Sequence, residues 1–265
     1  MSTDNDKQCY VDPHPAPCPP PDPNFHLEAV VVCDRYADFL RNTLPQNKQL
    51  FDRMIVITSP EDTETRKLCE FYHVECLPTD LLNSRWGKFC KGAGINVGLS
   101  KLSMKGWVLH LDADIWLPPQ TRILLQSINL DPTMLYGFDR FIVKGFKAWD
   151  RFMQLPTLQH EASAYIHMHA FPIGTRIFQP HFGGYIPIGF AQLWNPSFSK
   201  IFQYPSNHSD AGRTDLLFAA QWPRAKRSLL PEIVAYHLES TDSTFGGNWE
   251  GRKSAPFTFD AESET

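Results

Sequence analysis

Short apolar runs alternate with amphipathic stretches from residue 26 onward. Continuous β-branched runs such as LEAVVVC and RMIVITS indicate strands that are buried on both faces. Apolar residues at helical spacing predict helices between them. The predicted elements are strands at 27–33, 53–59, 73–79 and 106–117, and helices at 36–44, 63–72 and 92–102. Because strands and helices alternate, the pattern predicts an α/β fold with a doubly wound, mostly parallel sheet.

The chain after Pro119 is less regular and rich in aromatic residues, glycine and proline. We expect helices at 122–127 and 214–221, strands at 135–143 and 231–240, and an aromatic loop region at 171–194. No internal repeat or linker divides it. The sequence therefore predicts one domain, residues 26–253, between a disordered proline-rich tail (1–25) and a flexible C-terminal tail (254–265).

The composition of the chain excludes few classes of function. The 265-residue chain has a formal net charge of −4, which disfavours general binding to nucleic acid or anionic membranes. No apolar run is long enough to span a bilayer and the N-terminus lacks a signal-peptide pattern, so we expect no membrane span and a cytoplasmic protein, in the host cytoplasm if the protein is viral. Six cysteines without a CxxC pair argue against a disulfide scaffold and a structural zinc site.

The HLDAD motif at residues 110–114 ends a predicted buried strand. Side chains at i and i+2 of a strand share a face, so Asp112 and Asp114 point into the same space. Paired carboxylates repel each other unless a positive charge lies beside them. Oxygen ligands of this kind suit Mg²⁺ or Mn²⁺, which would hold substrate phosphates. Alternatively, one aspartate caps the next element and the other is merely exposed.

Other polar residues follow neighbouring strands. Cys33, Asp34 and Ser59 come at the ends of the first two strands, at the edge where ligands of parallel sheets bind. In FCKGAGINVGLS, Lys91 and Gly92 stand at the mouth of a helix, which favours phosphate oxygens. The alternative is an ordinary helix start.

The last predicted strand ends in YHLE, where His237 could complete a cation site or simply pack in the core. The following segment carries Arg252 and Lys253, which could close over a diphosphate or lie in a solvated tail. Asp215 falls in the first turn of a predicted helix. It could act as a general base or complement the helix dipole.

The order of these elements from 26 to 253 resembles glycosyltransferases of the GT-A fold, including family 2. The resemblance implies that Asp114 ligates the metal, that Asp112 lies nearer the ribose or the metal-bound water, and that a late histidine such as His237 is a further ligand. It also implies that the helix with Lys91 and Asn96 lies beside the nucleotide. Asp215 takes the place of the family's catalytic base, although Thr214 replaces the usual preceding acid.

The resemblance implies a metal-dependent glycosyltransferase that uses a UDP-sugar donor, such as UDP-glucose, and inverts the anomeric configuration. Small members of this kind include enzymes that glycosylate hydroxymethylated pyrimidines in DNA. A basic and aromatic set would suit such an acceptor: Arg140, Lys144, Lys147, Arg151, Arg176, Phe146, Trp149 and Tyr165.

Other functions stay open. The acceptor could be a glycan or a small molecule. A nucleotidyltransferase would need a glycine-rich loop after the first strand, and CDRYADF contains no glycine. A non-catalytic module that binds nucleotide-sugars or glycans would not need the metal-binding residues.

Overall fold

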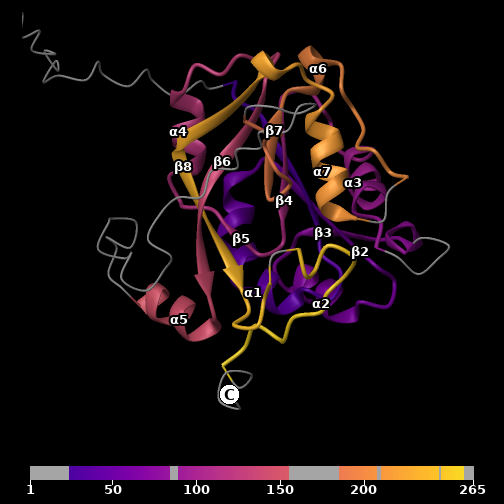
Figure 1. Ribbon diagram of the computed structural model, residues 1–265, viewed down its shortest axis with the longest axis vertical. Coiled ribbons are helices and arrows are strands. Elements are labelled where there is room, and N and C mark those ends of the chain that lie inside the picture. The colour runs from indigo at the N-terminus through magenta and orange to yellow at the C-terminus, as the bar shows by residue number, and fades with distance from the viewer. Residues whose placement is uncertain (1–23, 84–88, 155–184, 208–209, 245, 260–265) are drawn as a thin grey trace, which may run out of the picture.

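The computed structural model describes residues 24–83, 89–154, 185–207, 210–244 and 246–259. Most of the predicted N-terminal tail and residues 260–265 lie outside the described residues. One eight-stranded sheet, in the order β3-β2-β1-β4-β7-β6-β8-β5, runs through the molecule with helices packed on both faces (Figure 1). This architecture confirms the predicted α/β class with a single sheet.

The N-terminal half of the sheet is parallel, as the alternating pattern predicts. Its strands are β1 (Leu27–Val32), β2 (Arg53–Thr58), β3 (Glu75–Pro78) and β4 (Trp107–Asp112). The connecting helices are α1 (Ala37–Asn47), α2 (Thr63–Phe71) and α3 (Lys91–Leu99), with short 3₁₀ turns at Lys48–Leu50 and Asp80–Leu82.

Successive residues of β1 pack on opposite faces of the sheet. Ala29 and Val31 contact the core under α1 and α2, whereas Val30 and Val32 contact the core under α3. A strand buried on both faces needs apolar residues at every position, which explains the unbroken run in the sequence. The helices therefore cover both faces of the parallel half, as a doubly wound sheet requires.

The rest of the sheet is mixed, which corrects two predictions. The predicted strand 106–117 ends at Asp112 and turns into a second strand, β5 (Ile115–Trp116), which pairs with β8 instead of extending β4. The predicted loop region 171–194 ends in β7 (Ala191–Trp194), which is antiparallel to β4 and β6. The remaining elements are α4 (Thr121–Ser127), β6 (Leu135–Lys144), α5 (Phe146–Gln154), α6 (Pro196–Ser199), α7 (Ala211–Ala219), a 3₁₀ turn (Arg224–Lys226) and β8 (Arg227–Glu239).

The long pair β6 and β8 contains a bulge. The register jumps from Phe138 opposite Leu230 to Asp139 opposite Val234, and Pro231 lies in the skipped stretch. Proline cannot donate to the ladder, so it is tolerated where pairing is interrupted. Beyond the bulge the two strands carry Arg140 and His237.

The C-terminal segment packs on the body of the protein, which corrects the predicted boundary at residue 254. Phe257 is buried and stacks on Phe39 of α1, with ring centroids 4.7 Å apart. Its N–H donates to Asp38, and Ser240 donates to the carbonyl of Ala255. Residues 254–259 therefore belong to the folded domain. None of the helices in the described part of the chain has the length and apolarity needed to cross a bilayer.

Candidate functional site

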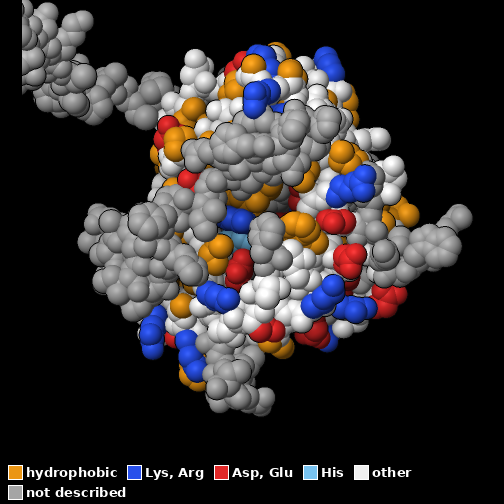
Figure 2. Space-filling model, viewed as in Figure 1, with side chains coloured by type: hydrophobic (Ala, Val, Ile, Leu, Met, Phe, Trp, Pro, Cys, Tyr) orange, Lys and Arg blue, Asp and Glu red, His pale blue; other side chains and the backbone are white. Residues whose placement is uncertain are grey.

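A cavity of about 560 Å³ opens at the carboxyl ends of β1 and β4. Asp34, Asp112, Asp114, Asp215 and His237 all line it. Figure 2 shows a hollow near the centre of this face where basic, acidic and histidine side chains lie close together. Open α/β sheets bind their ligands at this edge. The structure brings together here carboxylates that are up to 181 positions apart in the chain (Asp34 to Asp215).

Lys91 lies between two carboxylates at the floor of the cavity. Its Nζ is 2.7 Å from Asp112 Oδ1 and 3.1 Å from Asp215 Oδ2, and it also donates to the carbonyl of Gly189. Burial lowers the pKa of Lys91, but the two carboxylates outweigh it and raise that pKa above its ordinary value. An ammonium has three donors, and all three are used. In this structure Lys91 joins Asp112 to Asp215, whereas the sequence predicted that it contacts phosphate.

Asp215 is buried in the second turn of α7. The helix begins at Ala211 with Asp210 as its N-cap, since the Asp210 carboxylate accepts from the N–H of Arg213. Asp215 is therefore not in the first turn, which weakens the helix-dipole alternative. Burial raises the pKa of Asp215 to about 7, against the opposing effect of Lys91. A carboxyl with this pKa can accept a proton near neutral pH.

Gly189 lets the chain pass directly over Asp215. A Cβ built on Gly189 would lie 1.8 Å from the Asp215 carboxyl group, so any side chain there would displace the carboxylate. Asp215 Oδ1 is buried without a hydrogen-bond partner, which leaves one oxygen available to a ligand.

Asp114 and His237 form a second pair in the cavity. The antiparallel pairing of β5 with β8 places His237 opposite Ile115, and its Nε2 is 3.4 Å from Asp114 Oδ2. Burial raises the pKa of Asp114, but His237 outweighs this effect and the net pKa is lowered. Asp114 Oδ1 is buried and has no hydrogen-bond partner. A divalent cation fits an orphaned carboxylate oxygen beside an imidazole.

The predicted three-residue metal site is only partly assembled. Asp112 is held by Lys91, and the described residues contain no group of three or more histidine, cysteine, aspartate or glutamate side chains placed to hold a metal. Asp114 and His237 would therefore supply two ligands, and substrate phosphate and water the remainder.

Arg140 fixes the tautomer of a neutral His237 ring. Its Nη1 is 2.7 Å from His237 Nδ1. A guanidinium only donates, so Nδ1 accepts and a neutral ring carries its proton on Nε2, facing Asp114. For His237 to bind a cation through Nε2, the proton must be on Nδ1 and Arg140 must release it. The sequence predicted Arg140 only as part of the basic and aromatic set, because a single arginine in a strand does not indicate which histidine lies beside it.

Asp34, just beyond β1, lines the cavity, and Ser59, just beyond β2, supports it. The Ser59 hydroxyl donates to Asp34 Oδ1 at 2.5 Å. The neighbouring Cys33 does not serve there: it is buried, its Sγ contacts Thr65 Oγ1, and burial raises its thiol pKa. Cys33, which the sequence predicted at the donor site, therefore turns its side chain into the core.

Two further predicted donor-site residues have a packing role instead. A Cβ on Gly92 would lie 2.2 Å from the carbonyl oxygen of Pro205, so glycine is required for this close approach. Asn96 both donates to the carbonyl of Tyr204 and accepts from its N–H. Both residues thus fasten α3 to the segment that precedes α7, away from the described lining of the cavity.

Arg252 and Lys253, predicted to contact phosphate, have protein partners in this structure. Arg252 uses all five N–H donors within the protein: on both Asp38 oxygens and on the carbonyls of Arg35, Ser254 and Ala255. It fastens the C-terminal segment to α1. Lys253 is exposed beside Glu250, outside the described cavity lining.

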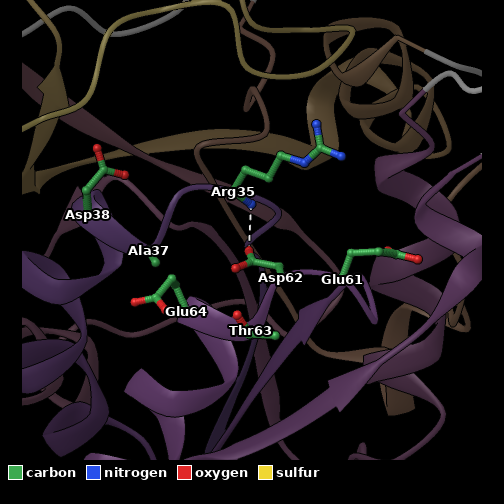
Figure 3. Close-up of a pocket in the computed structure, with 7 residues that line it drawn as sticks. All are labelled: Arg35, Ala37, Asp38, Glu61, Asp62, Thr63 and Glu64. Carbon is green, nitrogen blue, oxygen red and sulfur yellow. Dashed lines mark hydrogen bonds between the residues drawn. The ribbon is translucent and has the colours of Figure 1, made fainter.

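A second hollow of about 300 Å³ lies over the start of α1 and α2 (Figure 3). Its carboxylates organise the loop: Asp62 caps α2 and accepts from the N–H of Arg35, whose φ is 58°. Asp38 on its rim is bound to Arg252. Because these carboxylates already have partners within the protein, we interpret this hollow as a structural feature of the loop and not as a binding site.

The basic and aromatic set predicted for a DNA acceptor is only partly at the cavity. Trp149 is buried, donates to Asn42 and packs on Trp116, and Phe146 packs against Phe257. These rings belong to the core, and among the members of the set that the structure describes only Arg140 lines the cavity. Tyr165 and Arg176 lie outside the described residues.

No protein-family model matches the chain, and a search of curated proteins found no match. Among solved structures, glucosyl-3-phosphoglycerate synthase from Mycobacterium tuberculosis, in complex with Mn²⁺, UDP-glucose and phosphoglyceric acid, is similar at 12% identity over 81% of this chain and 72% of that chain, with a TM-score of 0.45. Mannosyl-3-phosphoglycerate synthase from Rubrobacter xylanophilus is similar at 14% identity over 65% of this chain and 54% of that chain, with a TM-score of 0.38. The fold and site described above rest on topology and geometry, not on likeness at this level.

Proposed function

We propose that this protein is a glycosyltransferase that moves a sugar from a nucleotide-diphosphate donor, a UDP-sugar, to an acceptor hydroxyl. The observation that carries the proposal is the placement of the Asp114–His237 pair and of Asp215, with its raised pKa, in one cavity at the carboxyl edge of the sheet. The Asp114–His237 pair suits a cation that is bound to phosphate, and Asp215 suits a general base.

Each residue has a role in this proposal. Asp34, braced by Ser59, lies where the nucleoside would bind beyond β1. Asp114 and His237 would hold Mn²⁺ or Mg²⁺, which when bound supplies positive charge to the departing diphosphate. Lys91 orients Asp215 and neutralises Asp112. A rigid ammonium between the two carboxylates lets them lie close together.

The proposed step is a single displacement. The acceptor hydroxyl transfers its proton to Asp215 while its oxygen bonds to the anomeric carbon. The bond from that carbon to the phosphate oxygen breaks, and its electron pair leaves with the diphosphate. The anomeric configuration inverts, so an α-linked donor yields a β-linked product. As the acceptor we retain a hydroxymethylated pyrimidine in DNA, with a glycan or small molecule as the alternative.

The proposal is tested with radiolabelled nucleotide-sugars and Mn²⁺, each with hydroxymethylated DNA, glycans or no added acceptor. We expect cation-dependent sugar release or transfer. Asp215→Asn should bind the donor but react about 10² to 10⁴ times more slowly, the scale of a lost general base. Proton NMR of the anomeric coupling gives the stereochemistry. Donor binding without any turnover would favour the non-catalytic module, and release of pyrophosphate would favour a nucleotidyltransferase.

A further inference from the structure

Three cations line the described part of the cavity: Lys91, Arg140 and Arg252. Two of them are fully used inside the protein. Lys91 places its three donors on Asp112, Asp215 and the carbonyl of Gly189, and Arg252 places its five on Asp38 and three carbonyls. Neither has a donor left for a substrate oxygen.

Arg140 differs from both. Of its five N–H donors, the described residues accept the one from Nη1, at the neutral ring nitrogen of His237. Its guanidinium lies 4.6 Å from the centre of the Phe190 ring, and its Nε is buried without a partner. The guanidinium forms no ion pair with the described residues; burial lowers the pKa of Arg140 and outweighs the nearby carboxylates, Asp114 first, which raise it. A buried guanidinium that is bound only to neutral groups is poised for an anion.

The position of Arg140 indicates which substrate carries that anion. His237 separates it from Asp114: the guanidinium is at Nδ1 and the carboxylate at Nε2. Phe190, under the guanidinium, directly follows Gly189, which abuts the Asp215 carboxyl group. Arg140 therefore lies on the side of the proposed base, whereas Asp34 and Ser59 lie at the proposed nucleoside end, just beyond β1 and β2.

We propose that Arg140 is the oxyanion-binding residue of an acceptor subsite, and that the acceptor carries a phosphate group near the hydroxyl that receives the sugar. This inference rests on the proposed function, because it assigns the acceptor side of the same cavity. Two oxygens of one phosphate group can each accept an N–H bond from the same guanidinium, an arrangement that a single hydroxyl cannot provide. The group could be a terminal phosphate of a small molecule or a diester phosphate of a nucleic acid.

The test uses the full chain saturated with UDP and Mn²⁺, so that donor binding is established first by calorimetry. Inorganic phosphate and dimethyl phosphate are then titrated separately, and the tighter ligand distinguishes a terminal phosphate from a diester. We expect one of them to bind while UDP stays bound. Arg140→Gln should weaken that binding about 10- to 100-fold, the scale of hydrogen bonds to a charged group. Arg140→Lys should restore part of it.

Lys67→Gln is the matched control, because Lys67 is an exposed cation on α2, outside the cavity lining. It should leave phosphate binding unchanged. Displacement of phosphate by UDP in the wild-type protein would assign Arg140 to the donor and overturn the proposal, as would unaltered phosphate binding in a folded Arg140→Gln. Failure of UDP itself to bind would instead contradict the proposed function.

Discussion

Asp215 owes its chemistry to burial and to two neighbours that the sequence does not place beside it. Gly189 gives it room, Lys91 supplies one hydrogen bond, and burial raises its pKa to about 7. A carboxyl with its ordinary pKa would be a weaker base, and one without Lys91 would be harder to ionise in the same place. The opposing effects of burial and of the Lys91 ammonium on the pKa of Asp215 therefore set the pH range in which it can act as a base.

The pH profile should report this carboxyl. Below its pKa, Asp215 is protonated and cannot accept the acceptor proton, so kcat/KM should rise with pH through a midpoint near 7. The measurement is kcat/KM for sugar transfer between pH 5 and 9, with the thermal melting point recorded at each pH. A profile that is flat across neutral pH while the protein stays folded would contradict the role of Asp215.

Replacing Lys91 should shift that midpoint. Lys91 lowers the pKa of Asp215, so Lys91→Met removes a stabilising charge and should raise the midpoint above 7. The pH profile of the variant is compared with that of Lys101→Met, an exposed lysine just beyond α3. An unchanged midpoint in a folded Lys91→Met protein would mean that the ion pair does not control the base.

At the scale of elements, the site depends on connections between distant strands and segments. The bulge between β6 and β8 precedes Arg140 and His237, and β5 pairs with β8 beside Asp114. The C-terminal segment fastens to α1 through Arg252 and Phe257. These contacts hold the elements around the cavity in place. Loss of one contact should therefore lower the stability of the fold more than it lowers the rate of the reaction.

Phe257→Ala should therefore destabilise the protein. Its ring is buried against Phe39, and removing a buried phenylalanine side chain costs about 3–5 kcal/mol. Phe259, two residues later, is 55% exposed, and Phe259→Ala should change the free energy of unfolding by less than about 0.5 kcal/mol. Urea denaturation of both variants measures the difference. Equal stability of the two would show that the segment is not part of the domain in solution.

At the scale of the whole molecule, ligand binding should couple to stability. The two halves of the sheet meet at the cavity, where Asp34 belongs to the parallel half and His237 to the mixed half. A donor and cation that bind both halves bind only the native state, so they stabilise it by mass action.

We expect Mn²⁺ and UDP together to raise the melting temperature more than either alone. At 100 times the dissociation constant the gain is about 2.7 kcal/mol. Asp114→Asn and His237→Ala should abolish the part that depends on Mn²⁺, since they remove the two side chains that would hold it, and a chelator should do the same for the wild-type protein. The control Asp131→Asn alters an exposed carboxylate that is paired with Lys226 far along the chain. A Mn²⁺ effect that persists in both site variants would place the cation elsewhere.

The sequence by itself determined the parallel half of the fold and the carboxylates of the site. Unbroken β-branched runs specify buried strands, and the i, i+2 spacing of Asp112 and Asp114 follows from strand geometry. These are local properties, because each depends on residues adjacent in the chain.

Only the tertiary structure decided the partners of those residues. Three of these contacts join segments that are 97 to 217 positions apart in the chain: Lys91 with Asp215, Arg252 with the segment before α1, and Arg140 with His237. Hydrogen bonds over such separations leave no periodic signal in the sequence, because any donor could meet any acceptor until the chain is folded. For the same reason Cys33, Gly92 and Asn96, which the sequence placed at the donor site, were found to pack and fasten the core around it.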